Sequence, residues 1–185
     1  MNRRGFLKVM LAGSASAPLI TEAVSWISGA KQSLVIYDAR YSDARTFAAK
    51  ALRLGAAALE SRQDIISLWY EGLGRYLENP EIRVMGLTAY NDFMVLRGCT
   101  TELKRQVVFE GIHDCRGGTT LTHTLRHSGA EKSYLQHTGP NWPAVLARAL
   151  LYENSRYQAE RETVVATTVR RAQDHPGTLV SWLIV

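Results

Sequence analysis

The chain has 185 residues, of which 46% are apolar and 21% are charged, and its formal net charge at pH 7 is +5. This length and composition predict one globular domain and exclude both a disordered chain and a fibrous repeat. Residues 1–30 contain three basic residues and one acidic residue, a net +2, which leaves +3 on the rest of the chain without a basic run. A nucleic-acid-binding surface is therefore not expected.

The first thirty residues predict an export signal. Two adjacent arginines are followed closely by Phe-Leu-Lys; these residues are Arg3, Arg4, Phe6, Leu7 and Lys8. They resemble the twin-arginine export motif. The segment after them contains no run of 18 apolar residues, so a stable transmembrane span is not expected. We predict a signal peptide over 1–30, a single domain over 31–185, and a periplasmic location reached through the twin-arginine translocase. Whether the signal is cleaved or kept as an anchor stays open.

From residue 33 onward, short apolar runs alternate with segments of helical period. The expected order is a strand at 33–37, a helix from about 42 to 55, a strand at 56–59, a helix over 64–78, a strand at 83–88, a helix over 90–103 and a strand at 106–111. Three strand–helix–strand repeats are typical of a parallel sheet covered on both faces. We therefore predict an α/β fold with a mostly parallel, doubly wound sheet of about four βα units.

The pattern changes after Cys115. A strand is expected at 119–127, then a loop-rich stretch, and then a helix that starts near Pro143. Residues 163–169 and 178–185 are rich in β-branched and apolar side chains and flank His-Pro-Gly. We predict that they form a C-terminal β-hairpin.

Three short motifs add a family resemblance. They are Asp-Ala-Arg at 38–40, Leu-Trp-Tyr at 68–70 and Gly-Leu-Thr at 86–88. Over residues 33–115 the chain is similar to small bacterial twin-arginine signal proteins with an α/β domain. The resemblance implies export and an α/β core, and it transfers no catalytic residue.

Candidate site residues follow the expected strands, because open parallel sheets bind ligands beyond the carboxyl ends of their strands. The residues there that offer useful chemistry are Asp38, Arg40, Thr88, His113 and Cys115. The same rule places seven more residues at this edge: Tyr41, Ser61, Arg62, Tyr90, Asn91, Asp92 and Asp114. We predict a catalytic group of His113 as base with Asp38 and Cys115. Arg40, Arg62 and Thr88 are the predicted ligand-binding residues for an anion.

Each of these residues also has a structural interpretation. Asp38 and Arg40 can form a surface ion pair, Thr88 can cap the helix that follows it, and His113 can be a solvated loop residue. Cys115 loses its thiol if it pairs with Cys99 in an oxidising compartment, and the sequence leaves that disulfide open.

No cofactor is expected on this chain. Gly-x-Gly-x-x-Gly, the phosphate-binding Gly-x-x-x-x-Gly-Lys-Ser/Thr, Gly-x-Ser-x-Gly and His-Glu-x-x-His are all missing from the sequence. His123 and His127 would lie about 13 Å apart on a strand, too far apart to share a metal ion. We therefore predict neither a nucleotide site nor a metal site.

Trp142 in a loop and Trp182 in an apolar C-terminus can form a surface for a partner, although burial of the terminus inside the domain is the alternative. Folded export, missing cofactor motifs and this surface together predict a non-catalytic accessory subunit, or export partner, of a larger periplasmic oxidoreductase. Any flavin or metal would then belong to the partner. The alternatives are a small periplasmic enzyme that uses His113 and Asp38, and a binder of small anions.

Overall fold

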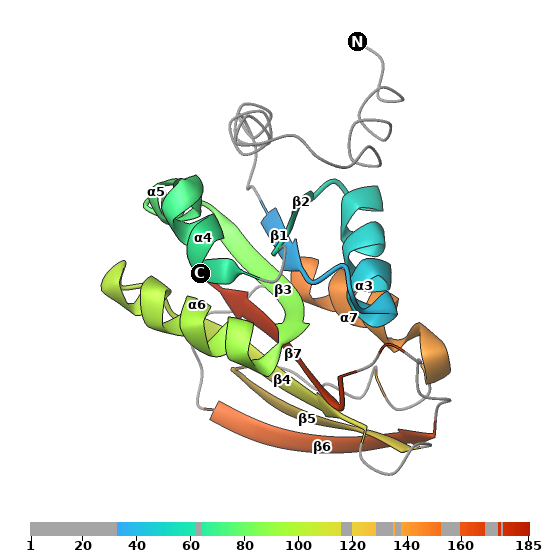
Figure 1. The fold of residues 1–185 in the computed structure, drawn as a ribbon. Helices are drawn as coiled ribbons and strands as arrows, with labels where there is room; N and C mark the ends of the chain where they lie inside the picture. The colour runs from blue at the N-terminus through green and yellow to red at the C-terminus, as the bar shows by residue number, and fades with distance from the viewer. Residues whose placement is uncertain are drawn as a thin grey trace.

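The computed structural model describes residues 33–61, 64–115, 120–128, 135, 138–152, 160–168, 174 and 176–185. The export signal and Arg62 lie outside these residues. Seven strands form one mixed sheet in the order β2-β1-β3-β7-β4-β5-β6, with helices on both faces (Figure 1). The predicted α/β class is therefore confirmed.

The strands are β1 (Ser33–Tyr37), β2 (Ala57–Glu60), β3 (Arg83–Ala89), β4 (Val107–Asp114), β5 (Thr120–Ser128), β6 (Glu160–Thr168) and β7 (Thr178–Ile184). The helices are α3 (Ser42–Arg53), α4 (Ile65–Leu68), the π-helical turn η1 (Trp69–Leu73), α5 (Gly74–Tyr76), α6 (Tyr90–Glu102), the 3₁₀ turn η3 (Gly139–Asn141) and α7 (Trp142–Leu151). The expected strands and helices thus form near their expected positions. The helix expected over 64–78 is interrupted at Gly72, whose φ of 139° is open mainly to glycine.

The mostly parallel, doubly wound arrangement is not confirmed. β1 pairs in parallel with β2 and β3, whereas the other pairings are antiparallel. β4 runs in the same direction as β3 but does not pair with it, because β7 lies between them. β5 follows β4 after a short connection and must therefore return antiparallel.

The C-terminal hairpin is not confirmed either. β6 pairs with β5 at the edge of the sheet, while β7 inserts between β3 and β4 near its centre. The physical reason is the continuous apolar run of β7, whose residues from Leu179 to Ile184 are all buried. A strand buried on both faces is stable only with a neighbour on each side and a helix layer on each face.

Two hydrophobic cores lie on opposite faces of the sheet (Figure 1). One core packs α3 and α7 against the sheet and includes Phe47, Trp142 and Leu183. The other core packs α4, η1, α5 and α6 and includes Phe93 and Trp182. The helix after β1 and the helix after β3 thus lie on different faces. None of the helices in the described part of the chain is long and apolar enough to cross a membrane.

Candidate functional site

A row of buried polar side chains lies where three strands end. Tyr37 pairs with Glu60 of β2 and Leu87 of β3, so the next residue, Asp38, lies between Ser61 and Thr88. The N–H of Ser61 donates to the carbonyl of Tyr37 at 2.9 Å, which continues the ladder past the end of β2. Ser61, Asp38 and Thr88 are 0%, 1% and 1% exposed. Neighbouring strands are about 4.8 Å apart, so the row is compact.

The position of this row in the topology suits a ligand. The chain leaves β1 for α3 on one face and leaves β3 for α6 on the other face. Neighbouring parallel strands whose connections diverge in this way leave a crevice at their carboxyl ends, where α/β proteins bind ligands. We define the strand-end cluster as Asp38, Arg40, Ser61, Thr88 and Asp92.

Asp38 and Arg40 form a tight pair. Arg40 Nε donates to both carboxylate oxygens of Asp38 at 3.0 Å, Nη2 donates to Oδ2 at 2.5 Å, and the backbone N–H donates to Oδ1 at 3.0 Å. The hydrogen bonds to Asp38 raise the pKa of Arg40. The predicted ion pair is present, and it compensates a buried carboxylate. Arg40 therefore uses several of its donors on Asp38, while its side chain stays 41% exposed.

Two oxygen atoms of the strand-end cluster have no partner. Ser61 Oγ and Asp92 Oδ2 are both buried and make no hydrogen bond. Asp92 lies in the first turn of α6, where burial first and the charge of Asp38 second raise its pKa, although Arg40 opposes the shift. Thr88 Oγ1, by contrast, accepts a hydrogen bond from Trp182 Nε1 at 3.2 Å. Ser61 and Asp92 are thus the polar groups left free for a ligand.

The predicted catalytic group of His113, Asp38 and Cys115 is not brought together. β3 and β7 lie between β1 and β4, so three strand spacings, about 14 Å, separate Asp38 from His113. Cys115 is buried, and its thiol and that of Cys99 are both free, so no disulfide links them. The separation arises because β7 inserts into the sheet, which sequence order alone did not indicate.

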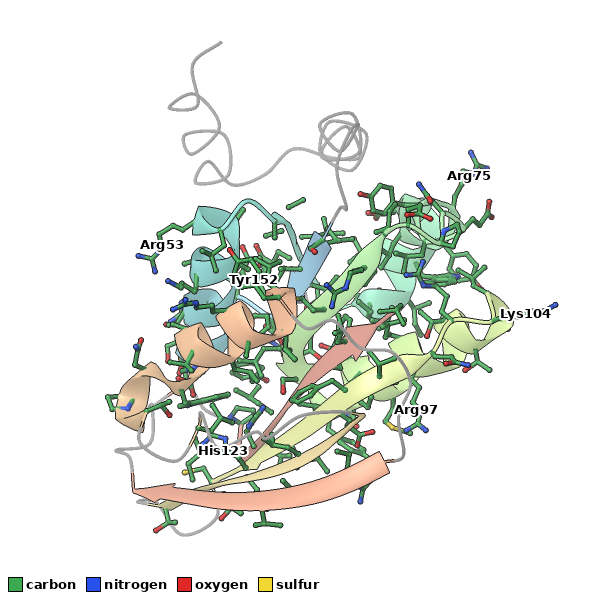
Figure 2. The ribbon with its side chains drawn as sticks, turned by 180° about the vertical axis from the view of Figure 1, so that it is seen from behind. Arg53, Arg75, Arg97, Lys104, His123 and Tyr152 are labelled. Atoms are coloured by element: carbon green, nitrogen blue, oxygen red, sulfur yellow. The ribbon has the colours of Figure 1, made fainter. Side chains whose placement is uncertain are left out.

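His113 instead belongs to a buried histidine cluster, formed by His113, His123, Trp142 and Ser181. His113 Nδ1 lies 2.7 Å from His123 Nδ1, and His113 Nε2 lies 2.7 Å from Ser181 Oγ. The Trp142 ring packs against both imidazoles at 4.3 Å and 5.0 Å, and Figure 2 shows His123 between the sheet and α7. All four side chains are at most 1% exposed. The cluster has the order of a nucleophile, base and orienting group, and it is as fully buried as Asp38, Ser61 and Thr88.

Trp142 and Trp182 do not form the predicted partner surface. They are 1% and 0% exposed, one in each hydrophobic core. Trp142 lies at the start of α7 rather than in a loop, and Trp182 lies in the central strand β7. The interpretation that the C-terminus is buried inside the domain is confirmed.

The sequence places Ser61 and Asp92 at this edge of the sheet, but it does not distinguish them as ligand-binding residues. Their distinguishing property is the lack of a hydrogen-bond partner, which no sequence pattern reveals. Ser181 was missed because it lies within an apolar run. Within the described ranges, no group of three or more His, Cys, Asp or Glu residues is arranged to hold a metal ion.

No family model matches this sequence, and neither a curated protein nor a solved structure has significant similarity to it. The chemistry of the strand-end cluster therefore has to carry the functional conclusion by itself.

Proposed function

We propose that this domain binds a small polar molecule at the strand-end cluster and exchanges a proton with it through Asp92. The observation that carries the proposal is the pair of buried oxygens without partners, Ser61 Oγ and Asp92 Oδ2. Buried polar atoms in native proteins are almost always hydrogen-bonded, and an unpaired one costs about 1–3 kcal/mol. A ligand that binds at the carboxyl ends of the parallel strands would supply the hydrogen bonds that these two oxygens lack.

The roles within the cluster follow from the environment of each carboxyl group. Arg40 donates to both oxygens of Asp38, so the Asp38 side chain is held in place by its own partner. Asp92 has a pKa raised mainly by burial and an unpaired oxygen, which suits a group that gives and takes a proton. Asp92 thereby replaces His113 as the acid–base residue.

Export through the twin-arginine pathway remains part of this proposal, supported by the motif around Arg3 and Arg4. An accessory role beside a periplasmic oxidoreductase stays a prediction. Trp142 and Trp182, on which its docking surface depended, lie in the interior. Purification of the tagged protein from its native host, followed by mass spectrometry, tests that role directly.

We expect Ser61→Ala and Asp92→Asn each to weaken ligand binding by about tenfold without destabilising the fold. Ser61→Ala removes a buried polar atom that has no partner, and Asp92→Asn replaces a buried carboxyl group by an amide that costs less to remove from water. The free energy of unfolding should therefore stay the same or rise by about 1 kcal/mol. The measurement is a thermal-shift screen of small polar compounds against the wild type and both variants. A compound that stabilises the wild type more than either variant identifies the ligand.

The control is Asn91→Ala, which changes an exposed neighbour of Asp92 in the same turn of α6. This variant should keep both stability and ligand binding. The proposal fails if Ser61→Ala and Asp92→Asn lower the free energy of unfolding by more than about 1 kcal/mol, because that loss indicates a structural role for both side chains. It also fails if both variants bind the compound as tightly as the wild type.

A further inference from the structure

The strand-end cluster lies in an acidic part of the molecular surface. Among the described residues, Asp38, Asp43, Asp64 and Asp92 occupy the strand ends and helix starts here, and Asp174 binds the start of α3 through Ser42. Arg40 and Arg45 are the basic side chains paired with them in the described residues. Among the residues that the structure describes, this edge therefore carries more acidic than basic side chains, which favours a ligand of positive charge.

Three of the five carboxylates have good internal partners. Arg40 pairs with Asp38. Asp174 accepts bonds from Ser42 N and Ser42 Oγ at 2.8 Å and lies 3.1 Å from Arg45 Nη2, and these bonds outweigh burial and lower its pKa. Asp64 caps α4 by accepting bonds from two backbone N–H groups and the Ser67 hydroxyl. These three groups are stabilised without a ligand.

The other two carboxylates, Asp43 and Asp92, have no cation beside them in an ion pair among the described residues. Burial and the charge of Asp174 raise the pKa of Asp43 to about 6, and burial and the charge of Asp38 raise that of Asp92. Both shifts have the same main cause, a carboxyl group held partly out of water, and in Asp92 the charge of Arg40 opposes it only in part.

Ser61 adds an independent observation at Asp92. Ser61 is completely buried, and its side chain continues the face of β2 that α4 and α6 cover, the same face as Asp38 and Thr88. Its unpaired Oγ therefore lies on the side of the sheet from which α6 presents Asp92. A hydroxyl and a carboxylate are both hydrogen-bond acceptors, which a donor with positive charge satisfies together.

We propose that the ligand of the strand-end cluster is a small organic ammonium compound whose charged nitrogen binds between Asp92 and Ser61. The inference rests on the proposed function and names its ligand class. A primary ammonium group has three N–H donors, so it supplies both missing hydrogen bonds and the missing positive charge. An anion at Arg40, Arg62 and Thr88 stays the alternative prediction: Arg40 pairs with Asp38, Thr88 Oγ1 accepts a bond from Trp182 Nε1, and Arg62 lies outside the described residues.

The test compares four probes on the full chain by amide NMR titration: ethanolamine, ethylene glycol, glycolate and Mg²⁺. The three organic probes are similar in size and present a cation, a neutral diol and an anion, and Mg²⁺ adds a divalent metal ion. Ethanolamine should move the amide signals of Ser61 and Asp92 and bind about tenfold more tightly than ethylene glycol, because a charge-assisted bond is the stronger one. Its affinity should rise with pH as Asp92 loses its proton, since the ionised carboxylate attracts the ammonium.

Two variants locate the effect. Asp92→Asn should weaken ethanolamine binding by about tenfold. Glu102→Gln makes the same change of charge at the exposed far end of α6 and should leave binding unchanged. Equal weakening by both variants would indicate a diffuse charge effect and overturn the assignment to Asp92.

The outcomes separate the two proposals. If glycolate, ethylene glycol or Mg²⁺ binds best and Ser61→Ala weakens that binding, the site stands and the ammonium inference falls. If none of the probes moves the signals of Ser61 and Asp92, the ammonium inference falls, and the thermal-shift screen then decides whether the site binds another compound. If ethanolamine binds with the expected dependence on Asp92, both proposals are supported.

Discussion

Replacing Gly86 by alanine is expected to destabilise the domain by about 3 kcal/mol, the upper range for overpacking a core. A Cβ atom at this position would lie 2.5 Å from the carbonyl oxygen of Ile36 and would overlap the Trp182 ring. The Ile36 carbonyl is held by the β1–β3 ladder, and the Trp182 ring is buried between β7 and α6. Neither group can move without breaking the centre of the sheet. Urea denaturation of the wild type and the variant measures the loss.

Gly98→Ala is the matched control. A Cβ at Gly98 meets nothing within 4 Å, and the residue is exposed on α6. Alanine favours a helix over glycine by about 1 kcal/mol, so this variant should be more stable than the wild type. If both alanine variants change the free energy of unfolding equally, the prediction is wrong, because crowding by Trp182 and Ile36 would then not be the reason for glycine at position 86.

Acidification is expected to destabilise the domain through His123 by about 3 kcal/mol between pH 6.5 and pH 4. Burial lowers the pKa of His123 from 6.5 to about 4, and its Nε2 has no partner. The unfolded chain therefore binds a proton that the folded chain excludes in this interval. Stability is highest above pH 6.5, falls as the pH drops to 4, and shows the full loss below that value.

The measurement is the free energy of unfolding in urea at pH 7, 5.5 and 4.5 for the wild type and for His123→Phe. Carboxylates also titrate in this range, but the difference between the two proteins isolates the histidine. The variant should lose less stability on acidification than the wild type. An NMR titration of the His123 ring provides a second test that needs no substitution. If the ring gains its proton near pH 6.5 in the folded protein, the predicted burial penalty does not exist.

The secondary structure could be predicted from the sequence because its signals are local. β1 was expected over the residues it occupies, and α3 and α6 end within two residues of their expected limits. Apolar spacing, Asp64 as a cap and the break at 79–80 act within one or two turns of the chain. The π-helical turn at Gly72 escaped prediction, because the periodicity around it is that of one continuous helix.

The pairing of the C-terminal strands could not be predicted in the same way. Residues 160–168 and 178–184 follow one another along the chain and read as a hairpin, yet β7 pairs with β3 and β4. Which strands pair depends on how much apolar surface each arrangement buries across the whole domain. The central position buries Trp182 against α6 and Leu183 against the opposite helix layer. A hairpin at the edge would leave one of these faces in water.

The sequence by itself determined which residues stand at the carboxyl ends of β1, β2 and β3, because strand limits and chain direction are local properties. It thereby placed Asp38, Arg40, Ser61, Thr88 and Asp92 at one edge. The tertiary structure alone decided that Arg40 neutralises Asp38, that Ser61 and Asp92 stay without partners, and that His113 lies in the core. Burial, charge compensation and hydrogen bonding depend on contacts with residues far away in the sequence. Only the folded structure contains these contacts, so the sequence alone does not reveal them.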